Sequence, residues 1–125
     1  MLNYSVKDFE KKLKSVRTKK RLNELFDPFS HYNCHIKGAV RSIAYNMETN
    51  WPIEYQKELI SQIESVEEEI NEILYEKFMD MNFDTDDFNC WDWTSIVYFL
   101  IYGELMGTFG TKNHGWFQSN IPDTF

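Results

Sequence analysis

Histidine and cysteine side chains are the residues of this chain whose spacing is closest to that of a metal site. His31, Cys34 and His35 can lie on one helical turn, and Cys90 or His114 would have to complete the set. Zinc takes four nitrogen or sulfur ligands in a tetrahedron. No second paired motif is present, and buried thiols or helix-capping histidines account for the same residues. We therefore predict no metal and no other cofactor.

An acidic segment with oxygen ligands is the second candidate. Asp84, Asp86, Asp87 and Asn89 have the composition of a calcium-binding loop. A loop that starts at Asp84, however, has Asn89 where the sharp turn needs glycine, and Ser95 where the loop ends on a bidentate glutamate. We interpret the segment as a solvated acidic loop or as part of a binding surface.

Catalytic arrangements are sparse. Cys34 or Cys90 could meet His114 to form a nucleophile and base, but two inert cysteines are the simpler interpretation. The sequence contains no P-loop, no Rossmann glycines and no HExxH motif. The first residues are polar, so we expect no signal peptide, a cytoplasmic location and two free thiols. We predict that the protein is not an enzyme.

Charge is divided unevenly along the chain. Residues 1–24 contain eight Lys and Arg against three acids, which leaves +5, and the other 101 residues carry −12. Such asymmetry indicates binding, because an acidic body attracts basic surfaces and repels nucleic acid. The basic segment is expected to lie against the glutamate-rich helix, in the same chain or in a second copy. We expect no nucleic-acid partner and no membrane span, and a homodimer is possible.

The acidic residues are concentrated in one region. Fourteen acids lie between Glu48 and Asp92, and on a long helix they would form an extended negative ridge. Aromatic residues make up 17% of the chain, more than a core of this size needs, so some are expected at an interface. Trp91 and Trp93 are the predicted anchors. The predicted partner-binding residues are Glu64, Glu67, Glu68, Glu69, Glu72, Asp84, Asp86, Asp87, Trp91 and Trp93.

Four or five helices must position these residues. Apolar residues recur at helical spacing in a basic helix at about 5–25, with Ser5 as its cap, and in a second helix from Ile36. A long acidic helix is predicted at about 52–79. The apolar run at 94–102 is predicted as a buried helix, with a strand as the alternative. The predicted fold is an all-α single domain over residues 1–125 with an irregular, aromatic C-terminal tail.

One segment resembles a known family. In residues 36–60, a short helix is followed by a W-P-x-Y turn and a second helix, and the matching residues are Ala39, Val40, Ala44, Asn46, Trp51, Pro52 and Tyr55. This outline is similar to part of the phage T7-type anti-restriction proteins. The resemblance implies a small, helical, dimeric and acidic protein that imitates DNA to occupy a restriction enzyme.

Together these features predict a small acidic protein that binds and inhibits another protein with a basic surface. A phage counter-defence factor that blocks a host nuclease or DNA-binding enzyme fits this description. An immunity protein or antitoxin that neutralises a cognate toxin fits equally well. A small metal- or cysteine-dependent enzyme is the alternative from another class.

Overall fold

Six α-helices make up most of the part of the chain that the structure, a computed structural model, describes, namely residues 2–26, 33–46, 50–84 and 91–105. They are α1 (Val6–Lys14), α2 (Lys19–Phe26), α3 (Ile36–Asn46), α4 (Ile53–Glu64), α5 (Glu67–Asp80) and α6 (Trp93–Tyr102). No strand occurs in these residues, so the predicted all-α fold is confirmed. The predicted aromatic tail at 106–125 lies outside the described residues.

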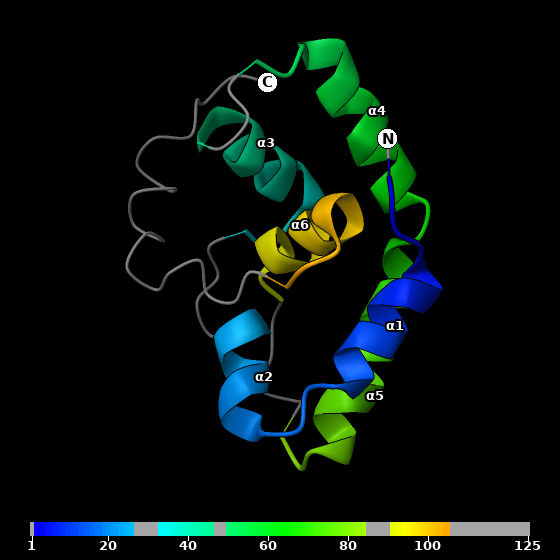
Figure 1. The fold of residues 1–125 in the computed structure, drawn as a ribbon, viewed down its shortest axis with the longest axis vertical. Coiled ribbons are helices and arrows are strands. Elements are labelled where there is room, and N and C mark those ends of the chain that lie inside the picture. Colours follow the sequence, from blue (N-terminus) through cyan, green and yellow to red (C-terminus); the bar gives the residue numbers. More distant parts are fainter. Residues whose placement is uncertain (1, 27–32, 47–49, 85–90, 106–125) are drawn as a thin grey trace.

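Helix α6 occupies the centre of the molecule (Figure 1). It packs against α3, α1 and α2, and eight of its ten residues are buried. A helix that is apolar on every side must be buried in this way. The Asp92 carboxylate caps its start by accepting the Thr94 N–H at 3.0 Å, and Gly103 ends it in the left-handed conformation with φ 78°. The apolar run at 94–102 is thus a helix and not a strand.

The basic N-terminal segment forms two helices instead of one. The Ser5 hydroxyl accepts the Asp8 N–H and the Asp8 carboxylate accepts the Ser5 N–H, which confirms Ser5 as the cap of α1. The first helix ends where the Ser15 hydroxyl donates to the Lys12 carbonyl. The Thr18 hydroxyl then accepts the Arg21 N–H at 3.1 Å and caps α2. Hydroxyl side chains interrupt the helix because they offer its backbone other hydrogen bonds.

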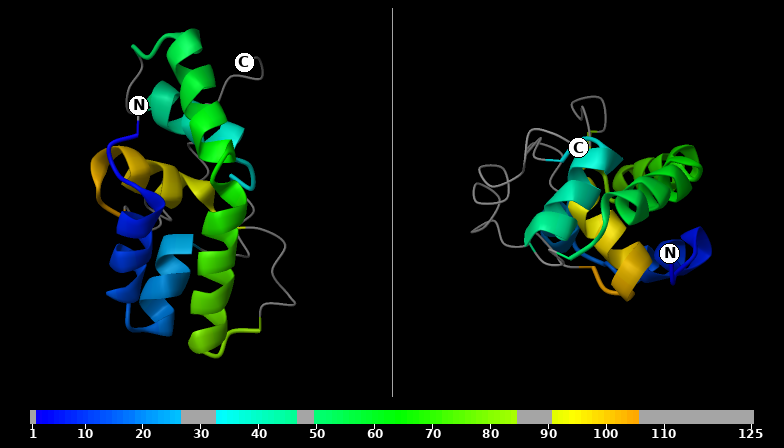
Figure 2. Two further views of the ribbon diagram at one scale, coloured as in Figure 1. Left: turned by 90° about the vertical axis from the view of Figure 1, so that its right-hand side faces the viewer. Right: turned by 90° about the horizontal axis from the view of Figure 1, so that it is seen from above.

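The predicted long acidic helix is also divided, into α4 and α5 (Figure 2). The Ser65 hydroxyl donates to the Gln62 carbonyl at 2.6 Å, and Val66 departs from helical geometry with φ −117° and ψ 9°. The first turn of α5 therefore consists of three glutamates, Glu67 to Glu69, and the helix dipole favours acids at this N-terminal end. These two divisions explain why the structure has more helices than the predicted four or five.

One continuous hydrophobic core joins all six helices. Phe9 of α1 lies at its centre, in edge-on contact with Phe26 of α2 and Phe99 of α6. Helix α1 also packs against α5, as expected for the basic segment and the glutamate-rich helix. Among the described residues, no helix is both long enough and apolar enough to cross a membrane.

Candidate protein-binding face

The two tryptophans predicted as surface anchors belong to the core. Trp91 is 8% exposed and Trp93 is 2% exposed. The ring of Trp91 stacks on that of Phe78, with 4.9 Å between centroids. The Trp93 side chain is enclosed by the core, and its main-chain N–H donates to the Asn33 main-chain carbonyl at 3.0 Å. Their interior partners leave neither ring available to a second protein. We therefore remove Trp91 and Trp93 from the candidate site.

The predicted acidic residues are mostly at the surface. Glu64, Glu68, Glu69, Glu72 and Asp84 are exposed. Glu67 is half-buried, and Asp86 and Asp87 lie outside the described residues. Four of the six acids that the structure places belong to α5, so this helix carries most of the predicted site.

An apolar pair completes the exposed side of α5. Tyr75 is 44% exposed and Met79 is 54% exposed, and among the exposed large apolar side chains of the described residues these two share one helix. Both lie away from the buried side of the helix, which is formed by Ile70, Leu74 and Phe78. The pair lies four residues apart, so its side chains are neighbours on the helix surface.

We define the α5 face as the exposed side of α5, made of Glu68, Asn71, Glu72, Tyr75, Glu76 and Met79. All of these except Met79 line a shallow hollow with a volume of about 370 Å³. The residues that line this hollow include three carboxylates and no base. An aromatic ring inside an acidic rim suits a protein surface that carries arginine or lysine together with an apolar contact.

Tyr75 and Met79 could have been found from the sequence, because each directly follows a core residue, Leu74 or Phe78, and so points about 100° away from it. The prediction overlooked them since it gave weight to tryptophan, the residue type most enriched at binding hot spots. Tryptophan is equally suited to a protein core, however, and composition does not show whether a given tryptophan lies in the core or at a binding surface.

The histidine and cysteine residues considered as a metal or thiol site do not form one in the described residues. Cys34 is disulfide-bonded, so the expectation of two free thiols is wrong for this residue. The chain contains one other cysteine, Cys90, which lies outside the described residues together with His31 and His114. Where the structure describes the chain, no group of three or more His, Cys, Asp or Glu residues is placed to hold a metal ion.

Comparison of the chain with protein-family models, with curated proteins and with solved structures gave no match. The resemblance of residues 36–60 to anti-restriction proteins therefore stays a prediction. The function must be argued from the chemistry of the α5 face itself.

Proposed function

We propose that the protein binds and inhibits a partner protein with a basic surface, and that the α5 face makes the contact. The observation that supports this most directly is the exposure of Tyr75 among three glutamates, with the exposed Met79 four residues further along the same helix. Glutamates steer a basic partner during its approach, and their attraction weakens as salt screens it. An exposed aromatic ring supplies the apolar area from which binding energy comes.

The division of the long helix helps to present this face. Because α5 begins at Glu67, its first-turn acids lie beside the positive end of the helix dipole and are stabilised there. Three buried side chains of α5 hold the opposite side against the core. The backbone of the α5 face is thus held in place, so a partner would have to order only the exposed side chains of the face.

Two biological roles of this protein fit such a partner. One is a phage factor that occupies the DNA-binding surface of a host nuclease, since an acidic helix replaces the phosphate charges of DNA. The other is an immunity protein or antitoxin that covers a cognate toxin. Both predict stoichiometric inhibition of the partner, and they differ in whether the target is a host enzyme or a toxin encoded beside this chain.

The test begins with capture of partners from bacterial lysate after nuclease treatment, followed by binding and activity assays with the purified partner. The charge-reversal variant Glu72→Lys/Glu76→Lys changes two acids of the α5 face, four residues apart. The matched control Glu54→Lys/Glu58→Lys changes two exposed acids of α4 with the same spacing. We expect the α5 variant to weaken binding by about tenfold or more and the α4 variant to retain it.

A second matched pair tests the aromatic anchor. Tyr75→Ala should weaken binding by about tenfold or more, as expected for a hot-spot aromatic. Tyr45 of α3 is 46% exposed and lies on another element, so Tyr45→Ala should leave binding unchanged. Equal affinities for the two tyrosine variants and for the two charge variants would contradict the proposed face. A partner that is bound but keeps its full activity would contradict inhibition.

A further inference from the structure

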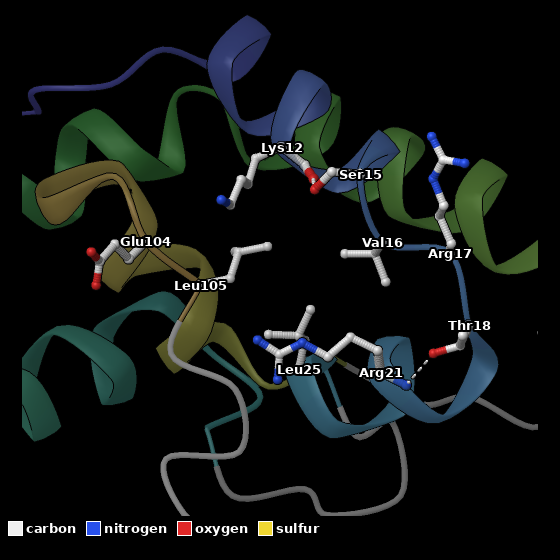
Figure 3. Close-up of a pocket in the computed structure, with 9 residues that line it drawn as sticks. All are labelled: Lys12, Ser15, Val16, Arg17, Thr18, Arg21, Leu25, Glu104 and Leu105. Atoms are coloured by element: carbon white, nitrogen blue, oxygen red, sulfur yellow. Dashed lines mark hydrogen bonds between the residues drawn. The ribbon is translucent and has the colours of Figure 1, made fainter.

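A second hollow of opposite chemistry lies where α1 and α2 meet the end of α6 (Figure 3). Its volume is about 450 Å³, within the range of roughly 300–1,000 Å³ that is usual for small-molecule sites. Lys12 comes from α1, Arg17 from the turn that follows and Arg21 from α2. Glu104 is the one acid among the residues that line it.

The lining therefore favours an anion within a protein whose net charge is −7. Figure 3 shows the side chains of Lys12 and Arg21 on opposite sides of the hollow, whereas the guanidinium group of Arg17 points away from it. Guanidinium groups suit phosphate because their N–H groups form paired hydrogen bonds to its oxygens. Arg21 also forms an exposed ion pair with Glu24 at 3.6 Å, a type of contact that is weak and easily exchanged.

The first turn of α2 points to the same ligand. It consists of Lys19, Lys20 and Arg21 and contains no acid. Positive side chains are unfavourable at this end of a helix, where the dipole is already positive. Lys19 has a structural role, since its ammonium group donates to the Asn82 carbonyl at 3.2 Å. Arg21 faces the hollow instead, and a bound anion would relieve the repulsion between its charge and the dipole.

Apolar side chains form the floor of the hollow. Val16, Leu25 and Leu105 line it and are 6%, 1% and 9% exposed. The volume of about 450 Å³ is larger than a phosphate ion fills, so a phosphorylated ligand with a larger body would reach this floor as well as the cations. The Ser15 and Thr18 hydroxyls add hydrogen-bonding groups at the edge.

We propose that this hollow binds a small phosphorylated ligand, with its phosphate on Lys12 and Arg21 and its body on Val16, Leu25 and Leu105. The site is separate from the α5 face, and the proposal does not rest on the protein's having an inhibitory partner. A nucleotide has both parts of the required ligand, and ADP is therefore a suitable probe.

The experiment measures the binding of ADP, adenosine and inorganic phosphate to the full chain by calorimetry at low salt. We expect ADP to bind more tightly than either fragment, because only ADP contacts both cations and floor. Lys12→Gln/Arg21→Gln should weaken ADP binding by about tenfold or more. Lys7→Gln/Lys57→Gln removes the same charge from exposed positions that do not line the hollow, and it should retain binding. Circular dichroism confirms that both variants are folded.

Several outcomes would overturn the proposal. The absence of a heat of ADP binding would do so, and so would equal ADP affinities of the two double variants. If inorganic phosphate bound as tightly as ADP, the apolar floor would contribute nothing to binding. A 5′-phosphorylated oligonucleotide that binds far more tightly than ADP, with a steep dependence on salt, would assign the surface to nucleic acid instead of a small ligand.

Discussion

The Asn33 side-chain amide donates a hydrogen bond of 2.6 Å to the Thr94 hydroxyl oxygen, and both residues are 5% exposed. The Asn33 carbonyl also accepts the Trp93 N–H at 3.0 Å. A single polar residue before α3 thus holds the first turn of α6 through its main chain and its side chain. Because α6 is the central helix, this contact fixes the position of the core relative to the surface helices.

Loss of either partner of this hydrogen bond is expected to destabilise the fold. Asn33→Ala and Thr94→Val should each lower the free energy of unfolding by about 1–3 kcal/mol, since each leaves a buried polar group without its partner. The two changes remove the same interaction, so the double variant should cost less than the sum of the single ones. Urea denaturation of the three variants measures this, and strictly additive costs would show that the two side chains act independently.

Gly103 supports a second prediction, because it has φ 78° and lies directly under Tyr4. A Cβ at this position would overlap the Tyr4 ring, and the left-handed conformation alone costs a residue other than glycine about 1–2 kcal/mol. Gly103→Ala should therefore lower the free energy of unfolding by at least about 1 kcal/mol. In a Tyr4→Ala background the substitution should cost less, and an equal cost in both backgrounds would show that the ring simply moves aside.

Much of the helical architecture could be predicted from the sequence, because local patterns determine it. Ile36, Ala39, Val40 and Ile43 recur at helical spacing, and all four are buried on α3. Ser5 has the residue type and position of a helix cap, and the structure shows that cap. The central helix was the harder case, since an apolar run of that length suits a buried strand as well.

The division of the acidic helix was not predictable from the apolar pattern. Ile63, Val66 and Ile70 keep helical spacing across the break, so periodicity continues where the helix itself stops. What ends α4 is a local contact of the Ser65 hydroxyl with the Gln62 carbonyl. Serine makes such contacts in some helices and not in others, and the choice depends on packing that the pattern does not contain.

The acidic charge of the candidate site could be predicted from the sequence, but its exposed aromatic residue was not predicted. Exposed glutamates follow from their composition, since charged side chains are seldom buried without partners. Trp91 and Trp93 are interior because α6 and the residue before its cap are central to the core, which depends on the whole fold. Tyr75 and Met79 are the anchors that we propose instead, because they are exposed on α5.

The capping box of α1 gives a prediction for pH. The Ser5 N–H and hydroxyl both donate to the Asp8 carboxylate and hold its pKa below the ordinary value of 3.8. Because this pKa is lowered in the folded protein, the cap stabilises α1 above pH 3.8 and is lost as pH falls through the lowered value. NMR titration of the Asp8 carboxyl group measures the midpoint. Ser5→Ala should raise the midpoint only part of the way, because the backbone N–H at position 5 remains, and an unchanged midpoint would contradict a role for the hydroxyl.

The disulfide of Cys34 predicts how its thiol reacts. In protein unfolded without a reductant, Cys34 should resist alkylation by iodoacetamide, and after reduction it should be labelled. Peptide mapping by mass spectrometry measures both states and identifies the bonded partner. Protein kept reduced and alkylated from the start serves as the control. Full labelling of Cys34 before reduction would show that the thiol is free.

Substitutions of Thr18 test how much the repulsion between the cations of the first turn of α2 and the helix dipole destabilises the fold. Thr18→Asp keeps a capping oxygen and adds a negative charge beside three cations and the helix dipole, so it should raise the free energy of unfolding by about 0.3–1 kcal/mol. Thr18→Ala removes the cap and should lower it by about 1 kcal/mol. Urea denaturation at low and high salt separates the two effects, because salt screens the charge and leaves the cap. The same aspartate lines the basic hollow and should weaken ADP binding there, so Thr18→Asp would gain stability and lose ligand together. Thr18→Asp could instead gain stability and bind ADP as tightly as the natural chain. That result would show that the repulsion in the first turn of α2 is unrelated to a ligand in the hollow.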